Sequence, residues 1–256
     1  MAIMEEPAPV ADAETGRMTL FEHLAELRRR LVISILAVAV GAIVAWCFYN
    51  RVLHFMLEPY ANFVRHHPGD DLTKGQLVTS GPLEGLTTRL KVSTYLGFAL
   101  GTPVILWELW RFITPGLHKH EKRYAVPFVV SAVALFSLGV TTAILVFPKA
   151  IDWLISISGK GVVPLFTPSK YFTLYVLMCL IFGLVFLYPI LLMFLMLAGV
   201  VPSKTWRKWR RPAIVVIAAV AAIATPSSDP FSFLAMAVPM YLFYEASIIL
   251  GRILKK

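Results

Sequence analysis

The chain contains six long runs of apolar residues, and these runs constrain its fold more than any other feature. A bilayer core of about 30 Å is crossed by roughly 20 apolar residues in a helix, because every backbone amide must be hydrogen-bonded within the segment. The sequence therefore predicts an all-α, polytopic membrane protein with six transmembrane helices. The runs cover about Leu31 to Tyr49, Val92 to Ile113, Ala125 to Phe147, Tyr171 to Val200, Ala213 to Ala224 and Phe231 to Leu250.

The composition excludes a water-soluble domain. Hydrophobic residues make up 58% of the 256 residues and charged residues only 15%, with a mean hydropathy of +0.72. Soluble domains are about 45–50% apolar and about 25% charged. The first 18 residues are acidic and have no apolar core, so they match neither a secretory signal nor a transit peptide. We expect a disordered cytoplasmic tail over residues 1–18, a membrane domain over 19–250 and a basic cytoplasmic tail over 251–256.

The fifth run is only 12 residues long, which as a helix reaches about 18 Å and is too short for the hydrocarbon core. The turn "TPSSDP" separates it from the sixth run, so we expect a hairpin of two short helices, the fifth and the sixth. Prolines in or near the runs should bend their helices and give a cupped bundle. These prolines are Pro103, Pro127, Pro148, Pro189 and Pro239.

The positive charges predict the orientation. Of the 24 lysines and arginines, 16 fall on the side of the two termini and 8 on the other. Since cytoplasmic loops are enriched in these residues, both termini should be cytoplasmic. Topology and contact with anionic lipid account for the net charge of +9, so nucleic acid is not needed as a partner.

Cysteines and histidines give no sign of a metal or redox site. Cys47 and Cys179 lie in separate apolar runs, and we expect two buried, unreactive thiols. His66 and His67 are adjacent and lack a third ligand at suitable spacing, so we predict no metal there. They belong to a long outward loop in which Pro59 should divide short helices that cover the outer face.

The stretch "TLFEHLAELRRRL" precedes the first run and mixes acids with arginines. Thr19 and Glu22 match a capping box, which predicts a helix that begins there and continues into the first span. Glu26 and Arg30 can pair at i, i+4, and in the simplest interpretation the arginines only set topology. That interpretation does not explain why two acids, Glu22 and Glu26, stand where they weaken the anchoring charge.

A second stretch with the same mixture joins the second and third runs. "WRFITPGLHKHEKRY" places one acid, Glu121, among basic residues, which by itself is also compatible with a solvated basic loop. Two carboxylates at one membrane surface are well suited to guanidinium groups, because each accepts two charge-assisted hydrogen bonds from arginine. Together, Glu26 and Glu121 suggest a di-arginine peptide as ligand.

Several motifs then resemble one family. "HLAELRRRL", "TPVILWELWRFITPGLHKHEKR", the "FP" at residues 147–148 and "TPSSDPFSFLAMAVPMYLFYE" resemble the twin-arginine protein translocation subunit TatC, in the right order and at the right span boundaries. The resemblance implies a non-enzymatic receptor in the bacterial cytoplasmic membrane. It would bind twin-arginine signal peptides of folded cargo and scaffold TatA and TatB for export driven by the proton motive force. No cofactor is implied, and the subunit would be homo-oligomeric within a larger complex.

The resemblance also assigns residues. It implies a signal-peptide site that contains Glu26, Glu121, Arg28, Phe112, Leu117 and Arg123. Thr225 matches a position near a partner-docking cluster of the family. An ordinary role as a turn residue is equally compatible with the sequence. Structural or functional roles would fall to Pro59, Pro103, Pro148 and Asp229.

Two positions depart from the family pattern. Leu187 stands where the family commonly has a glutamate within the fourth span, and Phe233 where it often has a glutamine. The acids that remain, Glu108 and Glu245, should pair with Arg111 or Arg252 near the cytoplasmic ends. A solute carrier or channel that uses these two acids is the alternative from another class. An intramembrane enzyme is the third, but no G-x-S-x-G or H-E-x-x-H motif occurs.

Overall fold

The computed structural model describes residues 20–66, 77–79, 81–113, 125–157, 166–197 and 209–253. All secondary structure in these ranges is helical. The helices are α1 (Leu20–Cys47), α2 (Tyr49–His66), α3 (Glu84–Ile113), α4 (Ala125–Ile157), α5 (Pro168–Val185), α6 (Tyr188–Leu197), α8 (Arg210–Ala224) and α9 (Pro230–Ile253).

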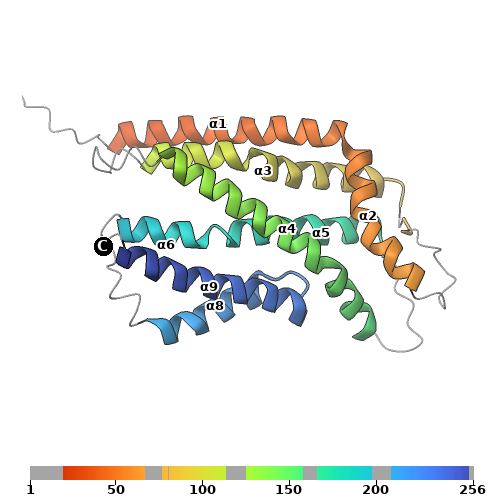
Figure 1. Cartoon of the computed structure of the whole chain (residues 1–256). Helices are drawn as coiled ribbons and strands as arrows, with labels where there is room; N and C mark the ends of the chain where they lie inside the picture. Colours follow the sequence, from red (N-terminus) through yellow and green to blue (C-terminus); the bar gives the residue numbers. More distant parts are fainter. Residues whose placement is uncertain are drawn as a thin grey trace, which may run out of the picture.

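The helices run back and forth between two ends of one bundle (Figure 1). The start of α1 and the ends of α3, α6 and α9 lie at one end, which we call the Leu20 end. The opposite end, which we call the Cys47 end, holds the end of α1, helix α2 and the turn between α8 and α9. The first and last described residues therefore lie at the same end, as expected for termini on one side of a membrane.

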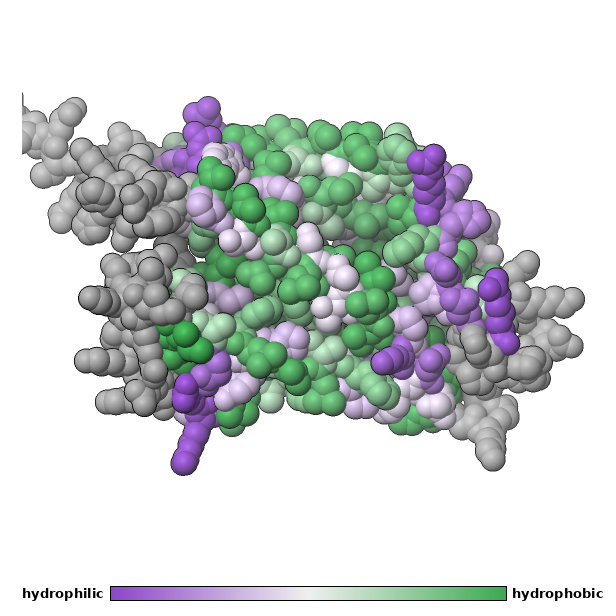
Figure 2. Space-filling view, in the orientation of Figure 1, coloured by the Kyte–Doolittle hydropathy of each residue, from purple (hydrophilic) through white to green (hydrophobic). Residues whose placement is uncertain are grey.

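The surface confirms a polytopic membrane protein. Five segments are long and apolar enough to cross a bilayer, and a band of hydrophobic surface separates more polar patches at the two ends (Figure 2). Helix α8 has 15 residues and is not among the five, so the sixth span stays a prediction. Helix α9 has 24 residues, and our expectation of a short sixth helix was wrong. Pro230 is favourable in the first turn of a helix, and the helix continues beyond Leu250, so the segment is longer than its apolar part.

Prolines lie inside several helices without ending them. Helix α2 passes through Pro59 as one helix of 18 residues, so the predicted division at that proline was wrong. Helix α4 passes through Pro148 and ends at Ile157, ten residues after the predicted end of its span. A proline removes one hydrogen bond, and neighbouring helices can compensate for this. In α4 the compensation comes from packing, because Ala150 and Ile151 beyond the proline are buried in the core.

The fourth span is divided. Helix α5 ends at Val185 and α6 begins at Tyr188, with a turn at Phe186 and Leu187 just before Pro189. Helix α5 packs mainly on α3 and α4, whereas α6 packs on α9.

Aromatic side chains fill the centre of the bundle and hold α2 against it. The rings of Phe147 and Tyr175 lie 4.4 Å apart, and those of Phe147 and Tyr171 lie 5.5 Å apart. The buried hydroxyl of Tyr171 donates a hydrogen bond of 2.9 Å to the carbonyl oxygen of Met56 in α2. Such a bond within the core fixes α2 across the Cys47 end.

Helices α1 and α3 approach closely because glycines form their contact. A Cβ atom at Gly97 would lie 2.6 Å from the carbonyl oxygen of Val38, and one at Gly41 would lie 2.9 Å from the carbonyl oxygen of Gly97. Small residues allow such close backbone packing between membrane helices. This contact sets α1 and α3 side by side along their length, and so it brings the polar residues at their Leu20 ends together.

Candidate functional site

An ion-paired group of two glutamates and one arginine joins α1 to α3 at the Leu20 end. Arg30 donates from Nε to Glu26 Oε1 at 3.1 Å, and its Nη2 also contacts that oxygen. From Nη1 it donates to Glu108 Oε2 of α3 at 3.1 Å. One guanidinium thus lies between two carboxylates, and we call Glu26, Arg30 and Glu108 the carboxylate pair site.

The carboxylate pair site is largely shielded from water. The side chains of Arg30, Glu26 and Glu108 expose 15%, 20% and 8% of their surface. Charges in such surroundings interact strongly, because solvent screens them little. Arg111 approaches Glu108 Oε1 only to 3.9 Å and is itself 58% exposed, so it neutralises the group weakly.

One oxygen of the site has no partner. Glu26 Oε2 is buried and accepts no hydrogen bond from any described residue. An ionised carboxylate oxygen that is removed from water without a donor carries a desolvation cost. Arg30 therefore does not satisfy Glu26 fully, and the free oxygen is suited to a further cationic donor.

The structure brings three of the six predicted signal-site residues to this end. Glu26 and Arg28 lie on α1, and Phe112 lies in the last turn of α3, where its ring stacks on His23 with centroids 4.5 Å apart. Arg28 is exposed. The others, Glu121, Leu117 and Arg123, lie outside the described residues, as do Thr19 and the side chain of Glu22.

Glu108 is the residue of this site that the sequence did not assign. We expected it to pair with Arg111, which it approaches, but its closer partner is Arg30, 78 positions away. The i, i+4 spacing indicated only the contact between Glu26 and Arg30. An acid within an apolar run was the one available signal for Glu108.

A second ion pair joins α8 to α9 at the Leu20 end. Arg210 Nη2 donates to Glu245 Oε2 at 2.5 Å, and the Tyr241 hydroxyl donates to Glu245 Oε1 at 3.3 Å. Arg252, which we predicted as a possible partner of Glu245, has a side chain that the structure does not describe. Since Glu108 and Glu245 are both paired at one end of the bundle, their arrangement does not favour a polar path for a small solute.

The turn between α8 and α9 contains Thr225 and Asp229. The Thr225 hydroxyl donates to the carbonyl oxygen of Ala221 at 2.6 Å, and its side chain is buried. Asp229 Oδ1 accepts from the backbone N–H of Ser232 at 2.8 Å, and Oδ2 accepts from the Ser227 hydroxyl. Asp229 thus caps the N-terminus of α9. Ser228, which lies between Ser227 and Asp229 in the turn, has a left-handed φ of 49°. These bonds show a structural use of both residues, while partner docking by Thr225 stays a prediction.

The thiols differ from what we expected. Cys47, at the last position of α1, is exposed, so the prediction that it is buried was wrong, and Cys179 is half-buried. The end of α1 has neighbours on one side only, which leaves Cys47 uncovered. No group of three histidine, cysteine or acidic residues in the described ranges could hold a metal ion.

Comparison with known proteins decides the family. The model of the Sec-independent protein translocase protein (TatC) family matches residues 22–239. The chain belongs to the TatC family. Translocase proteins TatC of Carboxydothermus hydrogenoformans and Aquifex aeolicus are 32% and 35% identical to it, over 94% and 92% of this chain and 96% and 95% of theirs. The TatC of Frankia casuarinae is 39% identical over 93% of this chain, which spans 66% of that longer protein.

A solved structure agrees with this assignment. The crystal structure of the twin arginine translocase receptor TatC in the detergent DDM superposes with a TM-score of 0.73 at 35% identity, over 90% of this chain and 99% of the other. TatC family membership makes the chain a multi-pass membrane component of the twin-arginine translocation system. The bacterial relatives agree with the predicted cytoplasmic membrane.

Proposed function

We propose that the chain is the receptor subunit that binds twin-arginine signal peptides of folded cargo proteins at the Leu20 end of the bundle. Glu26 and Glu121 accept the two guanidinium groups, and Arg28, Phe112, Leu117 and Arg123 line the same surface. The crystal structure that superposes on this chain is itself described as a receptor. The Leu20 end faces the cytoplasm in this proposal, as the distribution of lysine and arginine predicts.

The observation that supports the proposal most is the free oxygen of Glu26. Its Oε2 atom is buried and has no donor among the described residues, while Oε1 is held by Arg30, and Arg30 is shared with Glu108. Arg111 reaches only Glu108, at 3.9 Å, and it does not contact Glu26. A signal arginine would supply a donor to Glu26, since guanidinium groups bind carboxylates through charge-assisted bonds.

The position of the segment that carries Glu121 also supports the proposal. Residues 114–124 connect Ile113 of α3 to Ala125 of α4, and both of these residues lie at the Leu20 end. Ile113 directly follows Phe112, whose ring contacts His23 of α1. The described residues on either side of the segment therefore lie at the same end of the bundle as Glu26.

The subunit also scaffolds TatA and TatB in this proposal, and the assembled complex uses the proton motive force for export. The exposed apolar residues of α1, α8 and α9 offer faces within the membrane on which single-span partners can pack. The Thr225 turn lies at the Cys47 end of the α8 and α9 hairpin and is the proposed docking position. Several copies of the subunit assemble in one complex, as the resemblance implies.

Binding of a labelled signal peptide to the full chain in lipid nanodiscs tests the receptor proposal. A peptide with two arginines should bind, and a peptide with two lysines should bind at least about tenfold more weakly, because lysine cannot form the bidentate contact. Glu26→Gln and Glu121→Gln should each weaken arginine binding about tenfold or more, the value of one charge-assisted hydrogen bond.

Glu58→Gln is the matched control. Glu58 lies on α2 at the Cys47 end, so its neutralisation removes the same charge away from the proposed site. Equal binding of the arginine and lysine peptides, or equal weakening by all three glutamine variants, would refute the proposed recognition.

A further inference from the structure

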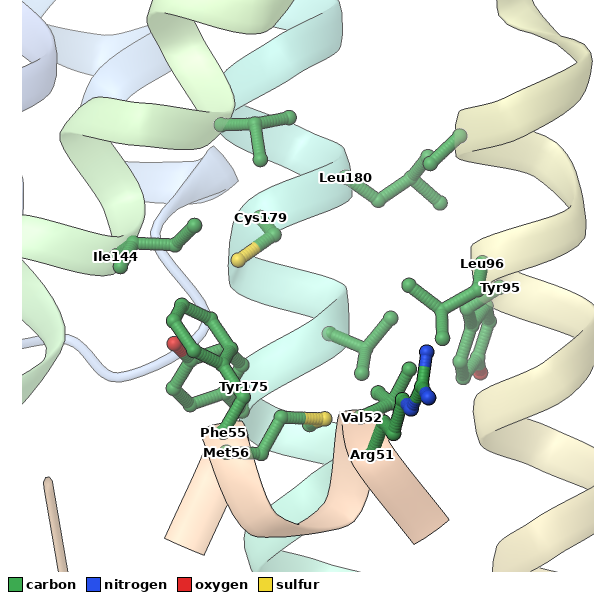
Figure 3. A pocket seen from close by; sticks show the side chains of 13 residues that line it. Arg51, Val52, Phe55, Met56, Tyr95, Leu96, Ile144, Tyr175, Cys179 and Leu180 are labelled. Atoms are coloured by element: carbon green, nitrogen blue, oxygen red, sulfur yellow. The ribbon is translucent and has the colours of Figure 1, made fainter. Parts of the chain in front are cut away.

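A cavity of about 350 Å³ opens between α2, α3, α4 and α5 in the half of the bundle nearer the Cys47 end (Figure 3). Its size is within the range of ligand pockets, about 300–1,000 Å³. Val52, Met56, Leu96, Ile144, Val176 and Leu180 form part of an almost wholly apolar wall. The cavity lies far from the carboxylate pair site, which is at the other end of α1 and α3.

Among the described residues that line this cavity, Arg51 is the only charged one. It lies four residues after Cys47, where both α1 and the first candidate membrane span end. Its guanidinium lies 5.8 Å from the centroid of the Phe48 ring, and no acid among the described residues comes within ion-pair distance of it. The cation is therefore available to an anion at the membrane surface.

A second residue of the lining, Tyr175, has a polar group without a partner among the described residues. The hydroxyl of Tyr175 is buried, with the residue 3% exposed, and it makes no hydrogen bond to any part of the chain that the structure describes. A buried hydroxyl without a partner costs free energy, and a ligand oxygen would remove that cost. Arg89 offers a contrast, because it donates to the Trp46 carbonyl oxygen at 2.9 Å and stacks on the Trp46 ring.

We propose that the cavity binds one anionic glycerophospholipid, with an acyl chain between the four helices and the phosphate at Arg51. An apolar hollow at membrane depth is surrounded by lipid tails, whereas water has no polar partners along such a wall. The planar guanidinium of arginine binds phosphate through two parallel, charge-assisted hydrogen bonds, so Arg51 can hold the phosphate of a lipid headgroup. The Tyr175 hydroxyl donates to a lipid oxygen.

The bound lipid joins α2 to the membrane-spanning helices, because its chain fills the space that separates them. Helix α2 contributes Arg51, Val52 and Met56, and α5 contributes Tyr175 and Leu180 from the opposite wall. This role is separate from signal recognition, since none of the lining residues belongs to the proposed receptor site.

Photo-crosslinking with lipid analogues tests the proposal on the full chain in liposomes. A phosphatidylglycerol that carries a diazirine on its acyl chain should label peptides containing Leu96, Ile144 and Leu180, as mapped by mass spectrometry. A phosphatidylcholine analogue with the same chain should label them about tenfold less, because its choline ammonium neutralises the phosphate charge that Arg51 attracts.

Arg51→Gln should reduce labelling by the phosphatidylglycerol analogue about tenfold, to the level of the phosphatidylcholine analogue, whose labelling should change much less. Arg65→Gln is the matched control, because Arg65 is an exposed arginine of the same helix that does not line the cavity. Tyr175→Phe removes only a hydroxyl and should reduce the yield about fivefold.

Three results would overturn the proposal. The first is equal labelling of the cavity by both lipid analogues in the native chain. The second is a pattern in which exposed membrane-facing residues such as Leu145 are labelled in proportion to their exposure and the cavity is not. The third is a crosslinker placed at Leu96 that captures a signal peptide or a second copy of the chain and no lipid. An unchanged yield in Tyr175→Phe would remove that hydroxyl from the site.

Discussion

Two sites at the Leu20 end of the bundle pair arginine with glutamate, but they differ in how fully the carboxylate oxygens are hydrogen-bonded. In the carboxylate pair site, two glutamates share Arg30, and Glu26 Oε2 has no donor among the described residues. Between α8 and α9, Glu245 has Arg210 to itself and accepts a further bond from Tyr241. Among the described residues, the first site has an unfilled acceptor and the second has none on its two carboxylate oxygens. Of the two sites, only the first therefore offers an open carboxylate oxygen to the arginine of the proposed ligand.

The two sites also differ in how firmly their helices are held. Helices α1 and α3 touch through glycine along their length, and their ion pair is largely buried. Helices α8 and α9 are joined by a capped turn, and Arg210 is 43% exposed. Substitutions in the first pair should therefore cost more stability than substitutions in the second.

The largest loss is expected for Glu108→Gln. Arg30 would keep its pair with Glu26 but lose its charge-assisted bond to the buried Glu108 carboxylate, which costs about 2–3 kcal/mol. The free energy of unfolding in mixed micelles titrated with SDS measures the change. Arg111→Gln is the control, because Arg111 is 58% exposed and 3.9 Å from the same carboxylate. Equal losses in the two variants would show that Arg30 is not the main partner of Glu108.

Gly97→Leu should cost about 2 kcal/mol, the usual range for overpacking. A side chain at this position meets the backbone of Val38 and Ala42 in α1, so the helices must separate. The same SDS titration measures the loss, and a disulfide crosslink between engineered cysteines on α1 and α3 reports the separation. Gly85→Leu is the control, since a Cβ at Gly85 has no atom within 4 Å. A stable Gly97→Leu protein with intact crosslinking would contradict the close contact.

Asp229→Ala should cost about 1–2 kcal/mol, the value of an N-cap with its hydrogen bonds. Both carboxylate oxygens of Asp229 are occupied within the turn, by Ser227 and by the backbone of Ser232. Thermal unfolding followed by circular dichroism measures the change. Asp152→Ala removes an exposed acid from α4 and should change the melting temperature little. Equal melting temperatures of the two variants would show that the Asp229 cap does not contribute measurably to stability.

Glu245→Gln should have the smallest effect, below about 1 kcal/mol, because a partly exposed ion pair is screened by solvent. The loss should shrink further when the ionic strength is raised, since salt screens exposed charges. Unfolding at low and high salt measures both statements. A loss as large as that of Glu108→Gln would remove the contrast between the two sites.

The spans could be predicted because the bilayer imposes a length on each apolar run. Where the prediction failed, packing was the cause. Helix α4 continues past Pro148 because Ala150 and Ile151 find buried neighbours, and α2 continues past Pro59 while Met56 and Tyr60 pack into the core. The expectation that proline ends or bends a helix rests on local backbone geometry. It takes no account of packing against helices that are distant in the sequence.

The candidate site could be predicted in part. Local spacing indicated the contact between Glu26 and Arg30, and family motifs assigned Phe112 to the same surface. The contact between Arg30 and Glu108 depends on the register of α1 against α3, which the glycines of their interface determine. The sequence of a single segment does not reveal how α1 is aligned against α3. The place of Glu108 in the carboxylate pair site was therefore found only in the structure.

The turn at Phe186 and Leu187 makes the fourth span a joint between two halves of the molecule. Pro189 has no N–H, so the carbonyl oxygen of Val185 cannot receive the bond that would continue the helix. The segment before the turn belongs with α3 and α4, and the segment after it belongs with α9. The turn therefore marks the point within a single crossing of the membrane where the chain passes from one set of neighbours to another, while α4 and α9 still hold the two sets together.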